Sequence, residues 1–336
     1  MEHLHHFGLS GDPFRNEPRM RDFLETRTQR EALARLERGL RQTKGLLVLT
    51  GDTGAGKTMV VRRLLENLEE EIFEAGMLVV LNGAADATWM LTRFARQLGV
   101  EEPEPEREAV LAQVYEQLAI IREDGRHAVL IIDDAHLLAS GDTLSEVCGL
   151  LKLEYEDRRL FSLVLSGGEE LDAAVSTDPA LSHAVQIRVR MQPLDAEGAA
   201  AYLAHRIKNA GGDPGTLEPA TVAALHRLGR GLPGLMNTLA DNALFEAFLC
   251  GRPRVTEADV VRAHADLGWQ AEPAPAAGPA APARARSEVE LLEPIEAALD
   301  SELEAVFDTG PRPRAPIDAP PKDEEPEDLV VELIDG

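Results

Sequence analysis

The sequence contains little cysteine, few aromatic residues and no long apolar run. Its two cysteines, Cys148 and Cys250, are too few for a disulfide framework, and neither lies in a CxxC or Cys/His pattern that would hold a metal ion. No stretch approaches the roughly 18 apolar residues that cross a bilayer, and the N-terminal MEHLHHFGLSGDPF has no apolar signal core. These absences predict that the protein is not secreted and does not insert directly into a membrane. We expect a cytoplasmic location.

Positive charge is also scarce, because 34 Lys and Arg residues face 59 Asp and Glu residues, for a formal net charge of −25. Residues 271–336 hold 17 of the acids and 5 of the bases, and residues 1–270 are acidic as well. Such a chain does not attract phosphate backbones as a whole, so DNA binding would need a local basic patch. The densest basic stretches, residues 15–38 and 152–159, are interleaved with acids. Nucleic acid is therefore not expected as a partner.

Short apolar runs alternate with segments of helical periodicity up to residue 193. This alternation is typical of βαβ units, and continuous apolar strands are typical of a parallel sheet covered on both faces. With aromatics at 4%, the core is expected to consist of Leu, Val, Ile and Ala. The last strand mixes polar and apolar residues and is expected at an edge. The predicted strands are residues 45–50, 77–81, 128–132, 162–166 and 185–191, and the predicted helices are residues 30–42, 57–71, 87–99, 109–123 and 144–153.

A helical region and a low-complexity tail follow. The helical pattern covers residues 195–209, 218–228, 232–249 and 256–267, and Thr256 and Asp259 are spaced for a capping box. The tail begins with an Ala/Pro-rich linker and continues with an acidic stretch of disordered composition, which is either a solubilising appendage or a docking segment for a partner protein. The predicted divisions are an N-terminal segment at 1–27, an α/β core at 28–193, a helical lid at 194–269, and the linker and disordered acidic tail at 270–336.

The clearest motif is GDTGAGKT, a complete GxxxxGK[ST] pattern between a predicted strand and a predicted helix. Its glycines let the loop turn its amides inward, where they and the positive end of the helix would hold phosphate oxygens. Lys57 would reach the β- and γ-phosphates, and Thr58 would offer its hydroxyl to Mg²⁺. The motif predicts ATP and Mg²⁺ as ligands. The residues expected at the nucleotide are Gly51, Asp52, Thr53, Gly54, Ala55, Gly56, Lys57, Thr58 and Met59.

An acidic pair ends another apolar strand, in AVLIIDDAH. Asp133 is predicted to hold Mg²⁺ together with Thr58. Asp134 is predicted to polarise the attacking water, and Asp134 and Lys57 are both predicted to be catalytic residues. The alternative role of Asp134 is to cap the next segment, and it reaches about 1.5 Å less far than a Glu. Ser166, at the end of a third strand, is the remaining catalytic candidate, either as a contact to the γ-phosphate or the attacking water or merely as a turn former.

With these motifs, the chain resembles the ExeA/GspA-like branch of AAA+ ATPases, related to general secretion pathway A and MSHA biogenesis proteins. The resemblance covers residues 5–268 and rests on HFGLSGDPFRNEP, QREALARLERGLRQTKGLLVLTGDTGAGKT, LLKLEYEDRRLFSLVLSGGEEL and GRGLPGLMNTLADNALFEAFLCGRPRVTEADV. It implies a three-layer AAA+ α/β domain followed by a helical lid. It also implies that the N-terminal segment packs beside the nucleotide base, with Phe7, Pro13 and Phe14 near the adenine. Anchoring of the N-terminus to the core is their alternative role.

Two arginines that the resemblance implies are missing. The arginine that senses the γ-phosphate from the lid is replaced by Gly234, and the candidate arginine finger before the fifth strand is replaced by Ala184, after His183. A missing finger costs about 10³–10⁵ in rate where it is used. The candidate substitutes, which are otherwise solvated surface charges, are Arg158, Arg159, Arg188 and Arg190.

Three functions remain open. The first is an ATPase or ATP-dependent switch that serves a cell-envelope machine such as secretion or pilus biogenesis, a link that the resemblance alone implies. The second is a DNA-associated AAA+ regulator of the transposition or replication-initiator type, against which the acidity argues. The third is a nucleotide-gated scaffold with little hydrolysis, favoured by Gly234, Ala184 and Asp134. ATP and a protein are the expected partners, and a monomer, a dimer and a ring all stay open.

Overall fold

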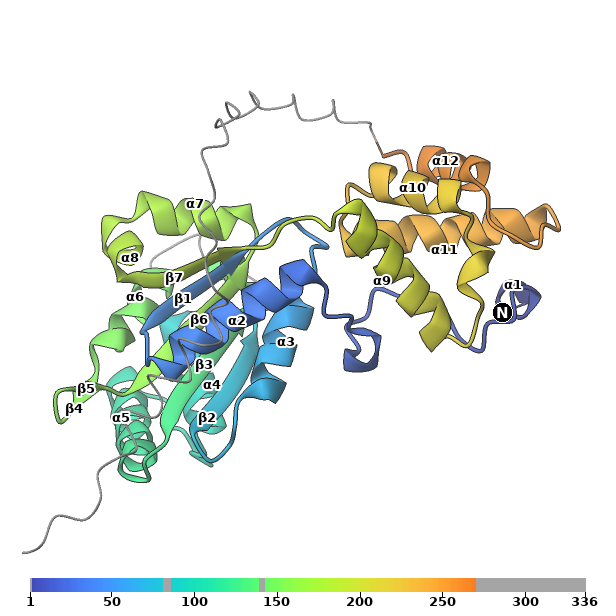
Figure 1. Cartoon of the computed structure of the whole chain (residues 1–336). Helices are drawn as coiled ribbons and strands as arrows, with labels where there is room; N and C mark the ends of the chain where they lie inside the picture. Colours follow the sequence, from blue (N-terminus) through green and yellow to red (C-terminus); the bar gives the residue numbers. More distant parts are fainter. Residues whose placement is uncertain (1, 81–85, 139–142, 270–336) are drawn as a thin grey trace, which may run out of the picture. The chain divides into compact units, whose positions relative to one another are not determined.

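The computed structural model describes residues 2–80, 86–138 and 143–269. They form an α/β region up to Met191 and a helical region after it (Figure 1). The predicted linker and acidic tail, residues 270–336, lie outside the described residues. Within the described part, no helix is long and apolar enough to cross a membrane.

Five parallel strands form the sheet of the α/β region, in the order β2-β3-β6-β1-β7 (Figure 1). The three middle strands are buried at every position, whereas the two outer strands are partly exposed. β7 pairs with β1 at the edge of the sheet, as its mixed composition predicts. The strands are β1 (Leu46–Thr50), β2 (Phe73–Val79), β3 (His127–Asp133), β6 (Phe161–Gly167) and β7 (Val185–Arg190).

Helices cover both faces of the sheet, which confirms the predicted three-layer parallel fold. Leu46 and Val48 of β1 enter the core beneath α4 to α8, while Leu47 and Leu49 enter the core beneath α2 and α3. Because alternate residues of a strand point to opposite faces, the middle strands are apolar except at or next to their ends. The helices are α2 (Arg27–Arg41), α3 (Lys57–Asn67), α4 (Ala87–Gln97), α5 (Arg107–Glu123), α6 (Thr143–Gly149), α7 (Glu169–Thr177) and α8 (Pro179–Ala184).

The second strand differs from its prediction. β2 begins at Phe73 instead of residue 77, and α3 ends at Asn67 instead of residue 71. Phe73 is buried and pairs with His127 at the start of β3, so the strand extends back to that residue. The polar Glu74 is tolerated because β2 is an outer strand with a partly exposed face.

A small hairpin was also missed. α6 ends at Gly149, and a 3-10 turn (Leu150–Lys152) leads into β4 (Glu154–Tyr155) and β5 (Arg158–Arg159). The two turn residues, Glu156 and Asp157, have positive φ angles of 50° and 60°. This conformation favours Gly and Asn, but the residues here are Glu and Asp. The sequence therefore contains no Gly or Asn that would predict the turn.

The helical region contains the four predicted helices, each within two residues of its predicted ends. The capping box of Thr256 and Asp259 forms as predicted. Leu4, Phe7 and Phe14 of the N-terminal segment are buried in the same core. Two roles were considered for Phe7 and Phe14, contact with the adenine and anchoring of the N-terminus. The structure shows that they anchor the N-terminus, and that they do so in the core of the helical region. The helices are α1 (Glu2–His6), α9 (Ala196–Asn209), α10 (Pro219–Leu228), α11 (Pro233–Leu249) and α12 (Glu257–Asp266).

A buried histidine lies at the start of β3. His127 is 4% exposed, and its Nε2 lies 2.8 Å from Oγ of Ser162, whose hydroxyl donates to the carbonyl of Lys44. Within the described residues, its buried Nδ1 has no hydrogen-bond partner. Burial, assisted by the nearby Arg122 and Arg159, lowers the pKa of His127 to about 4.

We expect acid to destabilise the fold through His127. Its pKa in the folded state lies below the value of about 6.5 in an unfolded chain, so the unfolded state takes up the proton first. Stability is therefore complete above about pH 6.5 and falls by about 3 kcal/mol as the pH approaches 4. Urea unfolding at several pH values should show a shallower pH dependence for His127→Gln than for the wild type. Identical slopes would contradict the assignment.

Candidate functional site

The loop of residues 51–56 joins β1 to α3, which is the context that its motif requires. Gly51, Gly54 and Gly56 have φ angles of 154°, 83° and 92°, which side chains disfavour. A Cβ atom on Gly51 would also lie 2.9 Å from Cβ of Met191. The loop ends at the first turn of α3, where backbone amides have no carbonyl partner within the helix and can bind an anion.

Lys57 begins α3 and lies across this loop. Its side chain is buried, and Nζ donates to the carbonyls of Gly51 at 2.8 Å and Asp52 at 3.0 Å. Burial lowers the pKa of Lys57, while the nearby carboxylates, Asp133 foremost, oppose the shift. The loop therefore holds a buried amine close to carboxylates, and only carbonyl oxygens accept its hydrogen bonds.

Two buried polar side chains end neighbouring strands without a partner. Asp133 is 1% exposed, and among the described residues neither of its carboxylate oxygens has a hydrogen-bond partner. Oγ of Ser166, in the adjacent strand, is equally buried and unpaired in this part of the chain. The register pairs Ile132 with Leu165, so Asp133 and Ser166 follow at the same level. Buried polar groups normally find partners, so this pair indicates a place for an ion or a polar ligand.

Asp134 follows the strand in a left-handed conformation, with φ of 56°. The next turn is closed by the backbone, because the N–H of Leu137 donates to the carbonyl of Asp134. The carboxylate lines the cavity described below, with Nδ1 of His136 3.9 Å from its Oδ1. Burial and the neighbouring Asp133 raise the pKa of Asp134.

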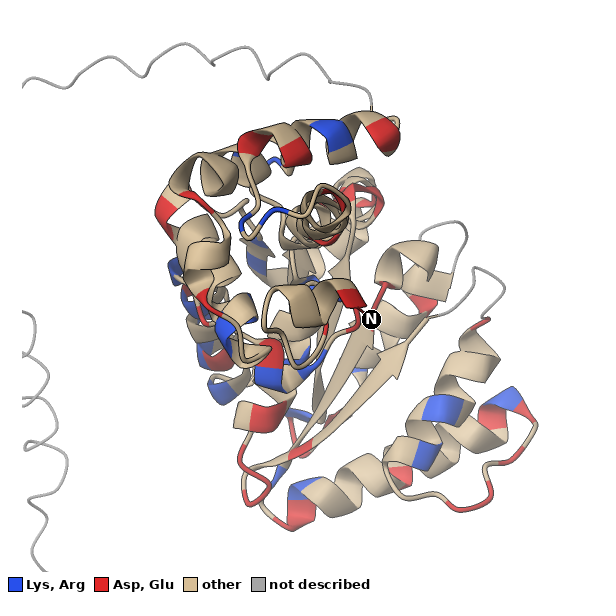
Figure 2. Cartoon of the chain, turned by 90° about the vertical axis from the view of Figure 1, so that its right-hand side faces the viewer, with Lys and Arg blue, Asp and Glu red and all other residues tan. Residues whose placement is uncertain are grey.

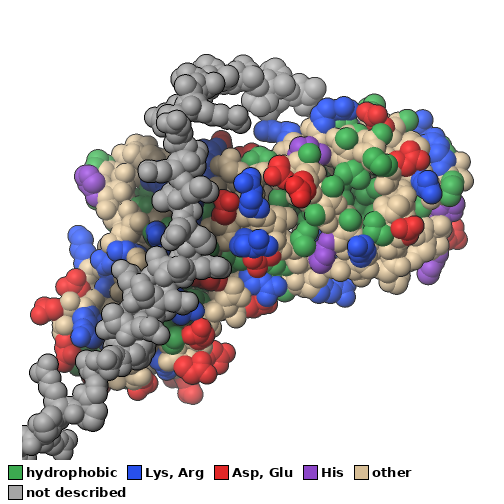
Figure 3. All heavy atoms as spheres, in the orientation of Figure 1, with side chains coloured by type: hydrophobic (Ala, Val, Ile, Leu, Met, Phe, Trp, Pro, Cys, Tyr) green, Lys and Arg blue, Asp and Glu red, His purple; other side chains and the backbone are tan. Residues whose placement is uncertain are grey.

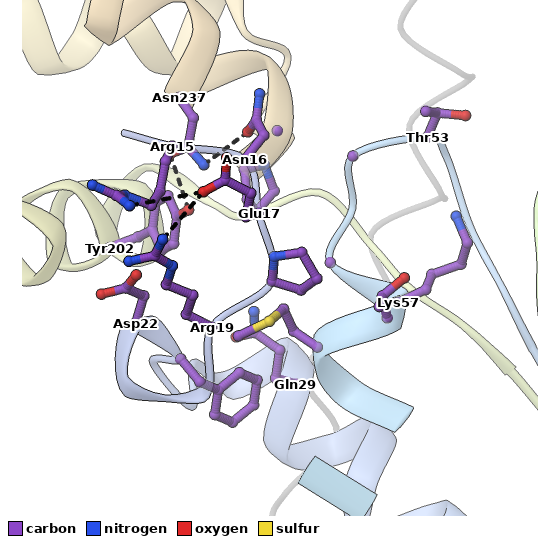
Figure 4. A pocket seen from close by; sticks show the side chains of 18 of the residues that line it. Arg15, Asn16, Glu17, Arg19, Asp22, Gln29, Thr53, Lys57, Tyr202 and Asn237 are labelled. Atoms are coloured by element: carbon purple, nitrogen blue, oxygen red, sulfur yellow. Dashed lines mark hydrogen bonds and ion pairs between the residues drawn. The ribbon is translucent and has the colours of Figure 1, made fainter. Parts of the chain in front are cut away.

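Lys57 and Asp134 border a cavity of about 500 Å³, a size typical of small-molecule sites, whereas Asp133 and Ser166 are not on its wall. One end is the phosphate loop, and the other is a segment of residues 15–24, here named the strap, together with α9 and α11 (Figure 4). Of the residues predicted at the nucleotide, the cavity wall contains Thr53, Gly54, Gly56, Lys57, Thr58 and Met59.

The other predicted residues lie behind this wall. Gly51 and Asp52 accept hydrogen bonds from Lys57, and Ala55 is buried in the core. Pro13 is not on the wall either, although the strap that follows it is.

Sequence reasoning missed much of the cavity wall. Several of these residues are brought together from distant parts of the chain, so no local pattern marks them. Other wall residues belong to stretches on which the family resemblance rests, namely Arg15, Asn16, Glu17, Pro18, Gln29, Gly168, Glu170, Pro233, Gly234 and Asn237. The missed residues include Gln29, His136, Leu137, Gly168, Glu170, Tyr202, Arg206, Pro233 and the strap.

The first turn of α11 contacts the phosphate loop directly. The N–H of Gly234 donates to the carbonyl of Gly54 at 2.9 Å. A Cβ atom on Gly234 would lie 2.9 Å from Cα of Gly54, closer than real side chains approach. The glycine that stands where an arginine was expected therefore permits a backbone contact that a side chain would prevent.

The candidate substitute arginines lie away from the cavity wall. Arg190 donates to Glu169 at 2.7 Å, and Arg188 lies 3.4 Å from Asp172. Nη1 of Arg159 donates to Gln186. The arginines on the wall are instead Arg15, Arg19 and Arg206.

Comparison with known proteins finds similar sequences and a similar fold. Residues 40–175 match the family described as AAA domain. The chain is 29% identical over 257 residues to general secretion pathway protein A of Aeromonas hydrophila, which is 76% of this chain and 46% of that protein. It is also 33% identical over 100 residues to an ORC1-type DNA replication protein of Cenarchaeum symbiosum (strain A), which is 28% of this chain and 24% of that protein. The chain thus spans less than half the length of these curated relatives.

A solved structure shares the fold. Cdc6p from Pyrobaculum aerophilum aligns with a TM-score of 0.59 and 21% identity, over 76% of this chain and 70% of that one. At this identity the likeness shows the fold alone. The AAA domain match and the similarity over three quarters of the chain show that the chain resembles general secretion pathway protein A and other proteins with an AAA domain.

Proposed function

We propose that the chain is an ATP-binding AAA+ protein that acts as a slow ATPase or a nucleotide switch. The observation that carries this proposal is the cavity where the phosphate loop, Asp134 and the start of α11 meet. The predicted ligands are ATP and Mg²⁺.

The residues present fit Mg²⁺. The carboxylate of Asp133 is buried without a hydrogen-bond partner among the described residues, and Thr58 adds a hydroxyl at the start of α3. Oxygen ligands of this kind suit the ion, and Asp133 and Thr58 would hold it. When bound, Mg²⁺ would neutralise charge on the phosphates.

The remaining side chains divide the chemistry between them. Lys57 would exchange its two carbonyl acceptors for phosphate oxygens, which are stronger acceptors for an ammonium group. Asp134 would accept a hydrogen bond from the attacking water and orient it, and its raised pKa improves it as a base. Ser166 would donate its unpaired hydroxyl to a phosphate or to the same water.

The contact of Gly234 with Gly54 would make the helical region responsive to the loop. A nucleotide that moves the loop must either carry α11 with it or break this hydrogen bond. A switch needs only that ATP binds the two arrangements with different affinity. The contact therefore supports a lid whose position follows nucleotide binding.

A protein partner would bind the helical region and so respond to the position of the lid. Figure 3 shows hydrophobic side chains gathered on the helical region. The exposed ones include Phe245 and Leu249 of α11 and Val261 of α12, which are 46%, 61% and 49% exposed. Exposed apolar groups of this kind mark interaction surfaces. The resemblance to general secretion pathway protein A supports a partner in a cell-envelope machine for secretion or pilus biogenesis.

The first test compares ATP binding with ATP turnover for the wild type and Lys57→Ala. Loss of the ammonium removes charge-assisted hydrogen bonds to phosphate, so we expect affinity for ATP to fall about 10- to 100-fold. Equilibrium titration in the presence of Mg²⁺ and release of inorganic phosphate measure the two quantities.

Asp134→Asn is the matched variant for chemistry. It keeps the size of the side chain, so ATP should bind normally while turnover falls by about 10² to 10⁴. A wild type that binds ATP but turns over no faster than Lys57→Ala would be a nucleotide-gated scaffold. A wild type that does not bind ATP would refute the proposal.

The contact between loop and lid predicts the effect of Gly234→Ala. The added methyl group would meet Cα of Gly54, and inserting a methyl into such a contact typically costs about 1–3 kcal/mol. We expect hydrogen exchange of the loop and of the first turn of α11 to become at least about tenfold faster. Gly149→Ala is the control, because a Cβ atom there has nothing within 4 Å. Equal exchange in both variants would show that the contact does not hold the lid.

The second candidate is a DNA-associated AAA+ regulator of the transposition or replication-initiator type. The similarity to the ORC1-type DNA replication protein favours it. Figure 2 shows acidic residues among the basic ones on the helices of both regions, which opposes it. We therefore expect no retention of duplex DNA in a mobility-shift assay at about 50 mM salt. Retention that disappears as salt rises would favour this candidate instead.

A further inference from the structure

The strap closes the end of the cavity farthest from the phosphate loop. It bridges the two regions, because the carbonyl of Pro18 accepts from Arg62 of α3 and the carbonyl of Arg21 accepts from Asn209 of α9. Phe23 packs in the core of the α/β region, with the guanidinium of Arg63 5.1 Å from its ring centre. The position of this wall thus depends on contacts with both regions.

Arg206 holds the beginning of the strap from α9. It is 6% exposed, and its Nε donates to the carbonyl of Pro13 at 2.6 Å. Its Nη2 donates to the carbonyl of Arg15 at 2.7 Å, and its Nη1 donates to the hydroxyl of Tyr202 at 3.2 Å. The planar guanidinium thus donates to the carbonyls of Pro13 and Arg15 at the same time, with a fixed geometry that a lysine could not reproduce.

From Tyr202 the hydrogen bonds continue into α11. The hydroxyl of Tyr202 donates to Oδ1 of Asn237, whose Nδ2 donates to Oδ1 of Asn16 in the strap. Asn16 in turn donates to Thr238. Figure 4 shows Tyr202, Asn237 and the strap residues on one side of the cavity, with Thr53 and Lys57 on the other.

The same network reaches the phosphate loop. Thr238 donates to the carbonyl of Gly234, and the N–H of Gly234 donates to Gly54. The start of α11, from Pro233 to Thr238, therefore touches both ends of the cavity.

Arg206 is not needed merely to attach the N-terminus. Leu4, Phe7 and Phe14 are buried in the helical core, and Ser10 is hydrogen-bonded to the carbonyl of Ala210 through its backbone and its hydroxyl. A buried guanidinium is costly even when it is hydrogen-bonded, so an apolar residue would serve a purely packing role better. Its three hydrogen bonds instead set where the strap lies.

We propose that Arg206 is a positioning residue for the nucleoside: by fixing the strap as a wall, it lets the site bind a nucleoside triphosphate in preference to the bare triphosphate. This inference rests on the proposed function. Arg206 acts through the strap, whose polar side chains Arg15, Glu17 and Arg19 line the cavity. The phosphate end depends on the loop and keeps its affinity without it.

The experiment measures equilibrium binding of ATP and of inorganic tripolyphosphate, with Mg²⁺, by titration calorimetry. In Arg206→Met, affinity for ATP should fall at least about tenfold, because the carbonyls of Pro13 and Arg15 lose a charged donor, while affinity for tripolyphosphate stays within about twofold. Arg227→Met is the control, since Arg227 lies on α10 and pairs with Glu257 at the surface. It should match the wild type for both ligands.

Tyr202→Phe keeps the inference testable if Arg206→Met does not fold. It removes one hydroxyl and should weaken ATP alone, by a smaller factor. Equal weakening of both ligands, or of neither, would overturn the positioning role. A wild type that binds tripolyphosphate as tightly as ATP would overturn it as well while leaving the phosphate site intact. A wild type that binds neither would remove the proposed function itself.

Discussion

The hydrogen bond from Gly234 to Gly54 is the contact on which the arrangement of the site depends. It requires the two backbones to approach so closely that a Cβ atom on Gly234 would lie 2.9 Å from Cα of Gly54, and the φ of 83° at Gly54 disfavours a side chain there. The helical region therefore meets the phosphate loop through a peptide group at the start of α11, where the helix dipole is positive. In the proposed switch, this contact makes the lid sensitive to the shape of the loop.

Charge balance gives the second constraint. Asp133 is buried beside an unpaired Ser166, and burial disfavours the ionised form of both Lys57 and Asp134. Among the described residues, Asp133 and Ser166 have no hydrogen-bond partner, and Lys57 donates to two backbone carbonyls. A ligand that brings phosphate oxygens and a divalent cation would satisfy all of them together, so nucleotide binding and local stability should be coupled.

The parts that the sequence predicts are those encoded locally. The loop glycines, the apolar strands and the capping box of Thr256 and Asp259 each need only neighbouring residues. The strap network could not be found in this way, because Arg206 and Pro13 are far apart in the chain and nothing in α9 distinguishes a buried guanidinium from a surface one. The hairpin was missed because Glu156 and Asp157 occupy its left-handed positions without Gly or Asn.

The lost lid arginine changes what such a switch would sense. A guanidinium reaches the γ-phosphate and so distinguishes a triphosphate from a diphosphate by charge. A backbone N–H bonded to Gly54 carries no net charge and reports only where the loop lies. Since the loop contacts Gly234 and the strap contacts Asn237 and Thr238, both near the start of α11, the lid would respond to a nucleoside and its phosphates bound together more than to the γ-phosphate alone. That selectivity suits a device that registers nucleotide occupancy better than one that cycles rapidly through hydrolysis.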